Sequence, residues 1–382
     1  MNGALKINLV LGQQLVFPPI RGGGVENLNF ALACQFARLG HNVVAYSRAI
    51  AELPTRDIDE HGIKHVRISG YDLHPNIWLD HINALRWAIR LTQILENADV
   101  TSFHTAFSFL LRYRAGLGVC THTIHRTPKA IVSLYRKLDR VYCGADAVVC
   151  QAKKLDSKID NLKRIYNCIE IQPDLIAPVS APQVYRGLLF LYVGRFVRDK
   201  GIESLIKGYE LSTQKHPRNR LETVGAQTDD SGADMIFFHD MLSYLETKQL
   251  KEYIKFLPPI FARLKLIAKM READVICVPS LSGETFSMAV LEGMALGKPV
   301  LVSDFGPMPE AIDHKVDGYV ADAGSAESIS NAISFFSENP ATLSEIGTAA
   351  QKKVREKFSS EVIATEYLLD FQTLIRKKMR HG

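Results

Sequence analysis

The sequence predicts an α/β protein made of two doubly wound parallel-sheet domains. Short apolar, β-branched runs alternate with amphipathic helical patterns along the chain, which is typical of parallel sheets with crossover helices. The length of 382 residues suits two domains. With 47% hydrophobic and 23% charged residues, the composition disfavours a disordered, fibrous or coiled-coil protein.

The first half of the chain opens with a βαβ unit. A strand is expected at Lys6–Leu11, a helix at Glu26–Leu39 that ends at Gly40, and a second strand at Asn42–Ser47. Further strands are predicted at Lys64–Ile68, Val100–Phe103, Val119–Ile124, Ala147–Cys150 and Arg164–Tyr166. The pattern stops between Ile169 and Arg186, a stretch with three prolines, and we place the domain boundary near residue 180.

The second half repeats this order. Strands are predicted at Leu188–Val193, Leu221–Val224, Ile254–Phe256, Val275–Val278, Val300–Val302 and Gly318–Val320, and helices at Ile202–Leu211, Arg263–Glu272 and Phe286–Leu296. The Asp-, Gly- and Ser-rich segment Gln227–Phe238 is interpreted as a surface insertion. We expect domains over residues 1–180 and 181–360, a terminal helix over 361–382, and ligands at the carboxyl ends of the strands, in a cleft between the domains.

The most informative stretch follows the strand that ends at Val278. A loop leads into a helix predicted from Phe286, whose first N–H groups form an anion site. Glu284 and Glu292 would lie roughly 12 Å apart along that helix, a span that suits the hydroxyl groups of a nucleotide sugar. Two helical glutamates are often simply solvated, but Glu292 lies among apolar residues, where an unpartnered carboxylate is costly.

Two glycine-containing loops complete the candidate site. The turn Gly194–Gly201 carries Arg195 and Lys200, which could hold a diphosphate or be ordinary surface charges, and it is not a P-loop. The loop after the first strand contains Gly22, Gly23 and Gly24, which permit close backbone approach to a ligand. A flexible turn is the alternative, and the absence of G-x-G-x-x-G spacing gives no support to NAD binding.

These motifs, in this order, resemble glycosyltransferase family 4, also described as glycosyl transferases group 1, the retaining nucleotide-sugar enzymes of the GT-B fold with its two Rossmann-like domains. The resemblance is strongest from Leu188 to Ala321. It implies that the second domain binds the nucleotide sugar, the first binds the acceptor, and the terminal helix crosses back to the first domain.

The resemblance also implies roles for individual residues. Glu284 and Glu292 would contact the donor sugar and the ribose, Arg195 and Lys200 would hold the diphosphate, and the glycines would approach the donor from the first domain. Thr285, Phe286 and Ser287 stand where the family frequently has Gly-Phe-Gly, so sugar recognition is expected to differ. His104, at a strand end, matches a family histidine near the reacting sugar; His125 is a second candidate.

No cofactor or metal is expected. Asp57-Ile58-Asp59 is a D-x-D tripeptide but lies in a charged loop, and we interpret it as coincidence. In such a site cations and helix N–H groups would stabilise the leaving diphosphate in place of Mg²⁺. The catalytic set is therefore predicted to be His104, Glu284, Arg195 and Lys200.

The net charge of +5 is too small to indicate a nucleic-acid partner, but it is unevenly distributed. Residues 1–180 contain 21 Lys and Arg against 15 Asp and Glu, and residues 112–164 alone have a net charge of +8. Within them, Lys129–Tyr142 is compatible with a basic amphipathic helix at an anionic membrane, or with a solvated surface helix.

Cellular location is inferred from composition and hydropathy. No signal peptide or membrane span is visible, and six scattered cysteines suit a reducing compartment. We expect a cytoplasmic protein, peripheral on the inner face of the cytoplasmic membrane.

The resulting prediction is a retaining hexosyltransferase that moves a sugar from a nucleoside-diphosphate donor, with UDP favoured, to an acceptor hydroxyl in glycan, glycolipid or glycoconjugate synthesis. The acceptor would be a carbohydrate, a lipid-linked group or a small molecule. A nucleotide-sugar epimerase or hydrolase, and a non-catalytic sugar-nucleotide-binding subunit, remain alternatives. The sequence leaves the donor base, the sugar, the acceptor and the oligomeric state open.

Overall fold

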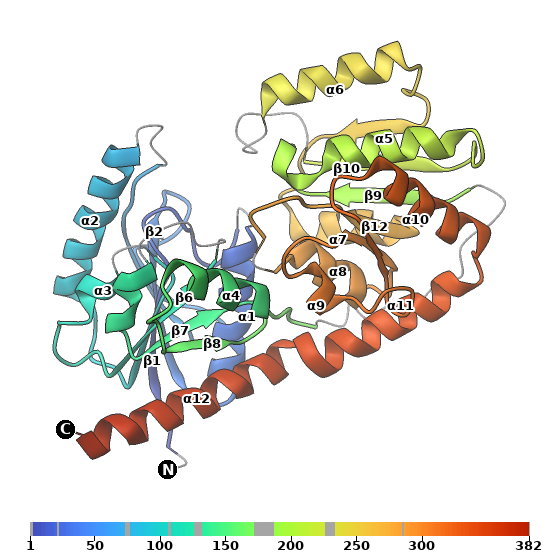
Figure 1. Cartoon of the computed structure of the whole chain (residues 1–382). Helices are drawn as coiled ribbons and strands as arrows, with labels where there is room; N and C mark the ends of the chain where they lie inside the picture. Colours follow the sequence, from blue (N-terminus) through green and yellow to red (C-terminus); the bar gives the residue numbers. More distant parts are fainter. Residues whose placement is uncertain are drawn as a thin grey trace. The chain divides into compact units, whose positions relative to one another are not determined.

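The chain forms two compact units. The computed structural model describes residues 3–20, 23–72, 77–105, 108–125, 132–171, 187–225, 234–284 and 286–381. Unit 1 consists of Met1–Glu170 and Ser360–Gly382, and unit 2 of Ile171–Ser359 (Figure 1). The units therefore separate after Glu170, and the chain rejoins unit 1 at Ser360.

Unit 1 contains an eight-stranded sheet in the order β3-β4-β2-β1-β5-β6-β7-β8. Its strands are β1 (Lys6–Val10), β2 (Asn42–Ala49), β3 (Arg56–Ile58), β4 (Lys64–Ser69), β5 (Val100–Phe103), β6 (Val119–Ile124), β7 (Arg140–Cys143) and β8 (Leu162–Arg164). All neighbouring pairs are parallel except β3 and β4. The carboxyl ends of β1 and β5 consequently meet at one edge, with Val10 opposite Phe103.

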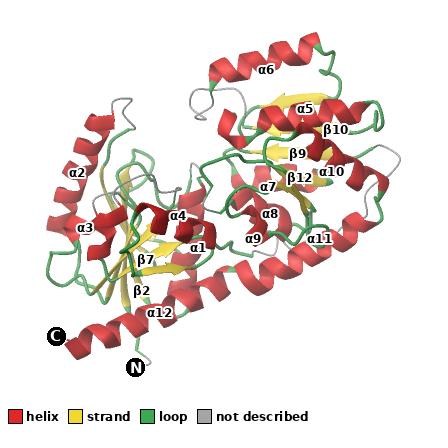
Figure 2. Cartoon of the chain, in the orientation of Figure 1, coloured by secondary structure: helices red, strands yellow, loops and turns green. Residues whose placement is uncertain are grey.

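Helices are packed on both faces of this sheet (Figure 2). The helices of unit 1 are α1 (Gly24–Arg38), α2 (Ile77–Ile94), α3 (Ser108–Leu111), α4 (Asp146–Leu155) and α12 (Ser360–His381). Val10 and Phe103 belong to a buried cluster with Trp87 of α2, whereas Tyr142 of β7 contacts Tyr367 of α12 edge-on at 4.6 Å.

A buried carboxylate anchors α12 in unit 1. Asp370 accepts hydrogen bonds from Tyr142 Oη at 2.9 Å and Arg140 Nε at 3.0 Å, and Lys163 Nζ lies 3.1 Å away. Since a buried charge is costly without partners, this cluster specifies where the helix docks.

Unit 2 contains a six-stranded, wholly parallel sheet in the order β11-β10-β9-β12-β13-β14. The strands are β9 (Leu189–Val193), β10 (Arg220–Val224), β11 (Ile254–Leu257), β12 (Val275–Val278), β13 (Val300–Ser303) and β14 (Tyr319–Ala321). The helices are α5 (Ile202–Thr213), α6 (Met235–Thr247), α7 (Arg263–Glu272), α8 (Met288–Ala295), α9 (Met308–Ala311), α10 (Ala326–Glu338) and α11 (Thr342–Lys353).

Strand alternation gives this sheet two buried faces. Val275 and Cys277 of β12 join the core that contains residues of α5, α6 and α10, while Ile276, pointing the opposite way, packs beside Gly293 of α8. Each unit is thus a doubly wound Rossmann-like sheet, and the predicted fold class is confirmed.

Several predicted elements were wrong. Ala147–Cys150 belongs to helix α4, in which Val148 and Ala152 are the buried residues, so the apolar run marks one helical face. The helix predicted at Lys129–Tyr142 is, within the described residues, a 3₁₀ helix at Val132–Lys137 followed by β7. β7 forms because Val141–Cys143 are fully buried between β6 and β8.

The predicted insertion at Gln227–Phe238 also needed correction. Residues 226–233 lie outside the described part, but Met235 already begins helix α6. Across the described residues, no helix combines the length and apolarity needed to cross a membrane.

Candidate functional site

In the turn after β9, a buried side chain that anchors the turn follows an exposed one. Phe196 is fully buried, where its ring meets those of Phe237 and Phe256. Arg195, the residue before it, is exposed and forms no ion pair among the described residues. Tyr192 Oη donates to the Arg195 carbonyl at 2.8 Å. The core side of the turn is therefore rigid, and its cation is accessible.

The turn is bonded to the loop after β12, which is next to β9 in the sheet. The carbonyl of Asp199 accepts hydrogen bonds from Leu281 N at 2.8 Å and Ser282 N at 3.2 Å. Gly201 has φ 72°, and a Cβ on it would lie 1.9 Å from the Pro279 carbonyl oxygen. Glycine is therefore required here both for the backbone angle and for the close approach.

This approach brings Lys200 and Glu284 together. The Lys200 ammonium forms an ion pair with Glu284 Oε1, and Ser280 Oγ donates to the same oxygen at 3.2 Å. Both charged side chains are mostly buried, at 17% and 14% exposure. Ser280, which sequence reasoning missed, lies four residues before Glu284 and is itself fully buried.

The loop that carries Glu284 is longer than predicted. Helix α8 begins at Met288 with Ser287 as its N-cap residue, so Glu284 lies outside the helix. The 12 Å separation expected from helical geometry therefore does not apply. Phe286 is buried, with its ring 5.2 Å from that of Phe358, while Thr285 lies outside the described residues.

Glu292 lies within α8 and is 6% exposed. Arg263, the first residue of α7, donates from Nη1 to Glu292 Oε1 at 3.0 Å. Burial raises the pKa of Glu292, and the charge and hydrogen bond of Arg263 oppose that rise. Arg263 was not among the predicted residues, because no local spacing connects it with Glu292.

The glycine loop follows β1 in unit 1. Gly22 lies outside the described residues, Gly23 has φ 114°, and Gly24 begins α1. The preceding segment is bonded to neighbouring strands by Arg48 N to Leu15 O at 3.0 Å. Buried Arg67 donates from Nε to the Phe17 carbonyl at 2.9 Å. These bonds position the start of the glycine loop at the carboxyl edge of the sheet.

The two candidate histidines form a pair at the same edge. His104 follows β5, His125 follows β6, and His104 Nδ1 lies 2.7 Å from His125 Nε2, so one ring donates and the other accepts. Their rings are stacked with centroids 5.0 Å apart. Burial lowers the pKa of His125 to about 4. It also lowers the pKa of His104 well below its usual value, and the neighbouring His125 and His122 add to that effect.

The carboxylates of the D-x-D tripeptide are occupied inside unit 1. Asp57 Oδ1 lies 2.6 Å from Arg67 Nη1, and Asp59 Oδ2 lies 2.9 Å from His65 Nε2. Both contacts support the sheet edge at β3 and β4, which accounts for these acidic residues structurally.

The structure thus groups the predicted residues by unit. Arg195, Lys200, Glu284, Ser287 and Glu292 follow strands or lie on helices of unit 2, and Gly23, Gly24 and His104 follow strands of unit 1. Lys200 and Glu284 are in direct contact. Within unit 2, cations and carboxylates at the carboxyl ends of parallel strands suit an anionic, hydroxyl-rich ligand.

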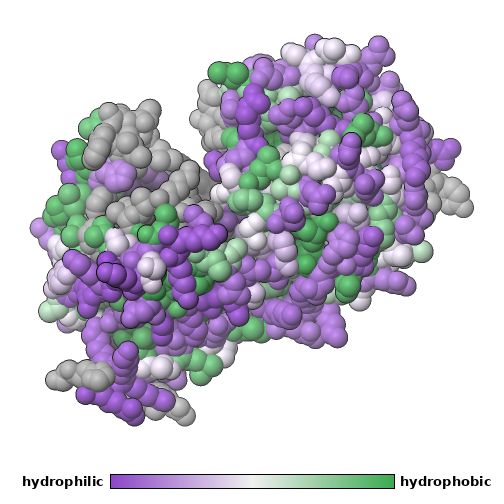
Figure 3. Space-filling model, viewed as in Figure 1, coloured by the Kyte–Doolittle hydropathy of each residue, from purple (hydrophilic) through white to green (hydrophobic). Residues whose placement is uncertain are grey.

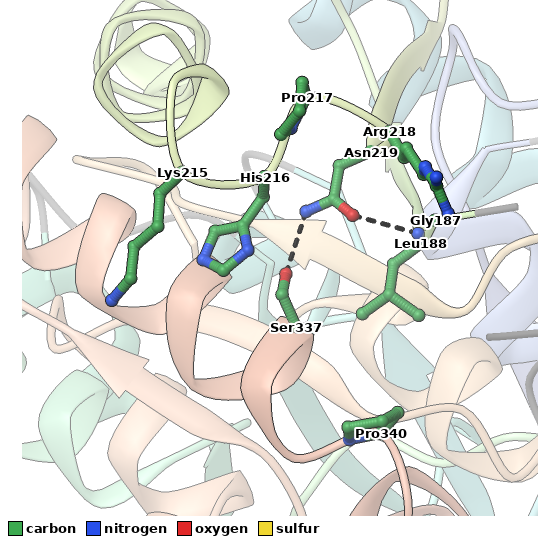
Figure 4. A pocket seen from close by; sticks show the side chains of 9 residues that line it. All are labelled: Gly187, Leu188, Lys215, His216, Pro217, Arg218, Asn219, Ser337 and Pro340. Carbon is green, nitrogen blue, oxygen red and sulfur yellow. Dashed lines mark hydrogen bonds between the residues drawn. The ribbon is translucent and has the colours of Figure 1, made fainter. Parts of the chain in front are cut away.

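A separate pocket lies at the opposite end of the unit 2 sheet (Figure 4). It encloses about 240 Å³ and is lined by Gly187, Leu188, Lys215, His216, Pro217, Arg218, Asn219, Ser337 and Pro340. Asn219 bridges its walls, accepting from Leu188 N at 3.0 Å and donating to Ser337 Oγ at 2.8 Å. Lys215 is paired with Glu338, and Arg218 is a second exposed cation at this pocket.

Family models match both units. A model described as Glycosyl transferases group 1 matches residues 184–353, and one described as Glycosyltransferase Family 4 matches residues 22–172. The two matches lie side by side along the chain and together include most of it.

Curated relatives match over different lengths. D-inositol 3-phosphate glycosyltransferase of Pseudarthrobacter chlorophenolicus is 30% identical over 162 residues, which cover 42% of this chain and 37% of that protein. Phosphatidyl-myo-inositol mannosyltransferase of Mycobacterium leprae is 24% identical over 291 residues, covering 75% of this chain and 70% of that protein.

Solved structures match nearly the whole chain. A glycosyltransferase from Rickettsia africae has a TM-score of 0.76 at 18% identity, covering 98% of this chain and 99% of that one. Anabaena Alr3699/HepE in complex with UDP and glucose has a TM-score of 0.76 at 17% identity, covering 97% and 100%. At these identities the similarity shows the shared fold.

The Gly201 contact gives a stability prediction. Gly201→Ala should lower the free energy of unfolding by about 3 kcal/mol, since a left-handed backbone and a clash with Pro279 are both imposed. The matched control is Gly306→Ala, because Gly306 has φ 56° and open space where its Cβ would lie; it should lose about 1 kcal/mol. Urea denaturation measures the free energy of unfolding of both variants. Equal decreases in the two would show that the close approach to Pro279 does not contribute to stability.

Proposed function

Because the chain belongs to the glycosyltransferases of family 4, the glycosyl transferases group 1, we propose that it transfers a hexosyl group from a nucleoside-diphosphate sugar to an acceptor hydroxyl. We further propose a UDP-sugar as donor, retention of anomeric configuration, and a place in glycan, glycolipid or glycoconjugate synthesis. Unit 2 binds the donor, and unit 1 binds the acceptor.

The observation that carries this proposal is the Lys200–Glu284 pair. A diphosphate binds cations, and sugar hydroxyls donate hydrogen bonds to acceptors such as carboxylates. The Lys200 ammonium and the Glu284 carboxylate supply one group of each kind at the same edge of the sheet, where Arg195 is also exposed. In the free protein each charge neutralises the other, which lets two mostly buried charged groups exist before the donor arrives.

The chemistry follows from these charges. When the bond between the anomeric carbon and the diphosphate oxygen breaks, negative charge develops on the leaving group, and Arg195 and Lys200 stabilise it. The acceptor oxygen forms the new bond to the anomeric carbon, and its hydroxyl proton passes to the leaving diphosphate oxygen. We propose that no metal is needed, because these two cations supply the charge that Mg²⁺ provides elsewhere.

The preference for UDP is supported by structural neighbours. HepE was crystallised with UDP, with UDP and glucose, and with UDP-glucose, and trehalose-6-phosphate synthase structures share the fold. UDP and UDP-glucose are ligands of HepE. Because this chain shares the fold of HepE, UDP is the first nucleotide to test with it.

An outward face of α2 supports the proposed location at an anionic membrane. Leu79, Ile82 and Ile89 are exposed there at helical spacing, with Arg86 and Arg90 on the same face. Figure 3 shows hydrophobic surface among hydrophilic side chains in the region of α2 and α3. We propose that this face, in place of the helix predicted at Lys129–Tyr142, contacts the cytoplasmic leaflet, and that the basic segment 112–164 adds long-range attraction.

The first experiment tests transfer itself. The protein is incubated with UDP-, GDP- and ADP-sugars and a panel of carbohydrate and lipid-linked acceptors, and products are identified by mass spectrometry with the anomeric configuration read by NMR. Lys200→Ala should lower turnover by at least tenfold through loss of charge stabilisation. Lys207→Ala, which removes an exposed helical ion pair, should leave turnover unchanged.

Other outcomes of that experiment decide between the alternatives. A changed or hydrolysed donor without any acceptor would indicate an epimerase or hydrolase. Unchanged turnover in Lys200→Ala, Arg195→Ala and Glu292→Ala together would contradict the assigned donor site.

The histidine pair gives a second prediction. His104→Ala should reduce turnover more than donor affinity, because we place His104 at the reacting sugar. Since burial lowers the pKa of both rings, the pair is neutral at pH 7, and turnover should not fall through protonation of the pair between pH 8 and pH 5. Turnover measured between pH 5 and 8 checks this; an effect confined to donor affinity would contradict the role.

Vesicle co-sedimentation tests the membrane face. The wild-type protein should pellet with phosphatidylcholine vesicles containing 30% phosphatidylglycerol at low salt, and less with phosphatidylcholine alone. Arg86→Glu with Arg90→Glu should weaken binding by at least tenfold, at roughly 1 kcal/mol per charge near the surface. Lys255→Glu with Lys352→Glu, on unit 2, is the charge-matched control; equal weakening by both pairs would contradict the assignment.

A further inference from the structure

Glu292 is an unusual carboxylate, because it lies in an apolar helix and one of its two oxygens is hydrogen-bonded. Its neighbours Val290, Leu291, Met294 and Ala295 are buried with it. A carboxylate in such surroundings stays ionised when a cation meets it. Arg263 Nη1 is that partner, at 3.0 Å from Oε1.

The pair leaves hydrogen-bonding capacity on both members. Among the described residues, Oε2 of Glu292 receives no hydrogen bond, and Arg263 forms no second ion pair. The Arg263 side chain is 33% exposed and that of Glu292 8%, so the pair extends from the interior to the surface. One carboxylate oxygen is thus fixed by Arg263, and the other is left to accept from a ligand.

Arg263 is the charged group that the structure pairs with Glu292 among the described residues. Burial raises the pKa of Glu292, and Arg263 is the charge that opposes it. Lys353 belongs to α11, which also packs against α8. Its Nζ forms ion pairs with Asp313 Oδ2 at 2.9 Å and Asp317 Oδ2 at 2.8 Å.

We propose that Arg263 is a positioning residue of the donor site, which keeps Glu292 ionised and oriented so that its free oxygen accepts hydrogen bonds from the ribose diol of the donor. This inference rests on the proposed donor role of Glu292 and adds to it the residue that makes that role possible. A ribose diol presents two adjacent O–H donors, and an ionised carboxylate is the acceptor-only group that matches them.

The test compares two nucleotides that differ in the diol alone. UDP and 2′,3′-dideoxy-UDP carry the same base and the same diphosphate, so phosphate titration is common to both. Calorimetric titration is done with the wild type, Arg263→Met and Arg263→Lys, between pH 5.5 and 8.5. Lys265→Met, an exposed lysine on the same helix, is the matched control for loss of a charge.

The expected result is selective. Arg263→Met should weaken UDP binding by roughly tenfold, the scale of one charge-assisted hydrogen bond, while binding of the dideoxy analogue changes little. Because loss of Arg263 raises the pKa of Glu292, the variant should lose UDP affinity at a higher pH than the wild type as pH falls. Arg263→Lys should recover part of the affinity, and Lys265→Met should behave as wild type.

Binding of the dideoxy analogue also reports that the variant is folded. An equal loss for both nucleotides in Arg263→Met, or an unshifted pH profile, would overturn the inference, as would a wild type that does not distinguish the two nucleotides. A wild type that binds no UDP, GDP or ADP would instead contradict the proposed function.

Discussion

The close approach of Gly201 to the Pro279 carbonyl is the contact on which the candidate donor site depends. β9 and β12 are neighbours in the sheet although 80 or so residues separate them, so their following loops emerge side by side. With no Cβ between them, the loops come near enough for Asp199 to accept two backbone hydrogen bonds. Lys200 and Glu284 then meet as a consequence of backbone geometry, before any ligand is present.

The buried carboxylates Asp370 and Glu292 differ in how many of their oxygens have partners among the described residues. In Asp370 both carboxylate oxygens are satisfied, by Tyr142, Arg140 and Lys163. Lys353 is likewise held between two aspartates. Each of these buried charges lies against opposite charges of its own unit. Glu292 has a partner for one oxygen among the described residues, and the other oxygen keeps its capacity to accept a hydrogen bond.

Unit 1 brings its candidate residues to one sheet edge by the same topological means. The loop after β1 is held by backbone bonds to β2 and by the Arg67 guanidinium, and the neighbouring ends of β5 and β6 present His104 and His125. Neutral, stacked imidazoles suit a site that must position hydroxyl groups. The excess positive charge of this half of the chain lies mainly within residues 112–164.

The sequence by itself determined the fold class and most strands of both sheets, and it supplied the residue types of the candidate donor site, because parallel strands are continuous apolar runs and glycine-flanked charges mark their ends. It misplaced the start of α8 and missed β7 and α4, since short apolar runs do not distinguish strand from helix. Only the tertiary structure decided that Ser280 supports Glu284, that Arg263 faces Glu292 and that His104 bonds His125. Those pairings join residues on different loops and helices, and no periodicity along the chain encodes which side chains the packing of a sheet will bring together.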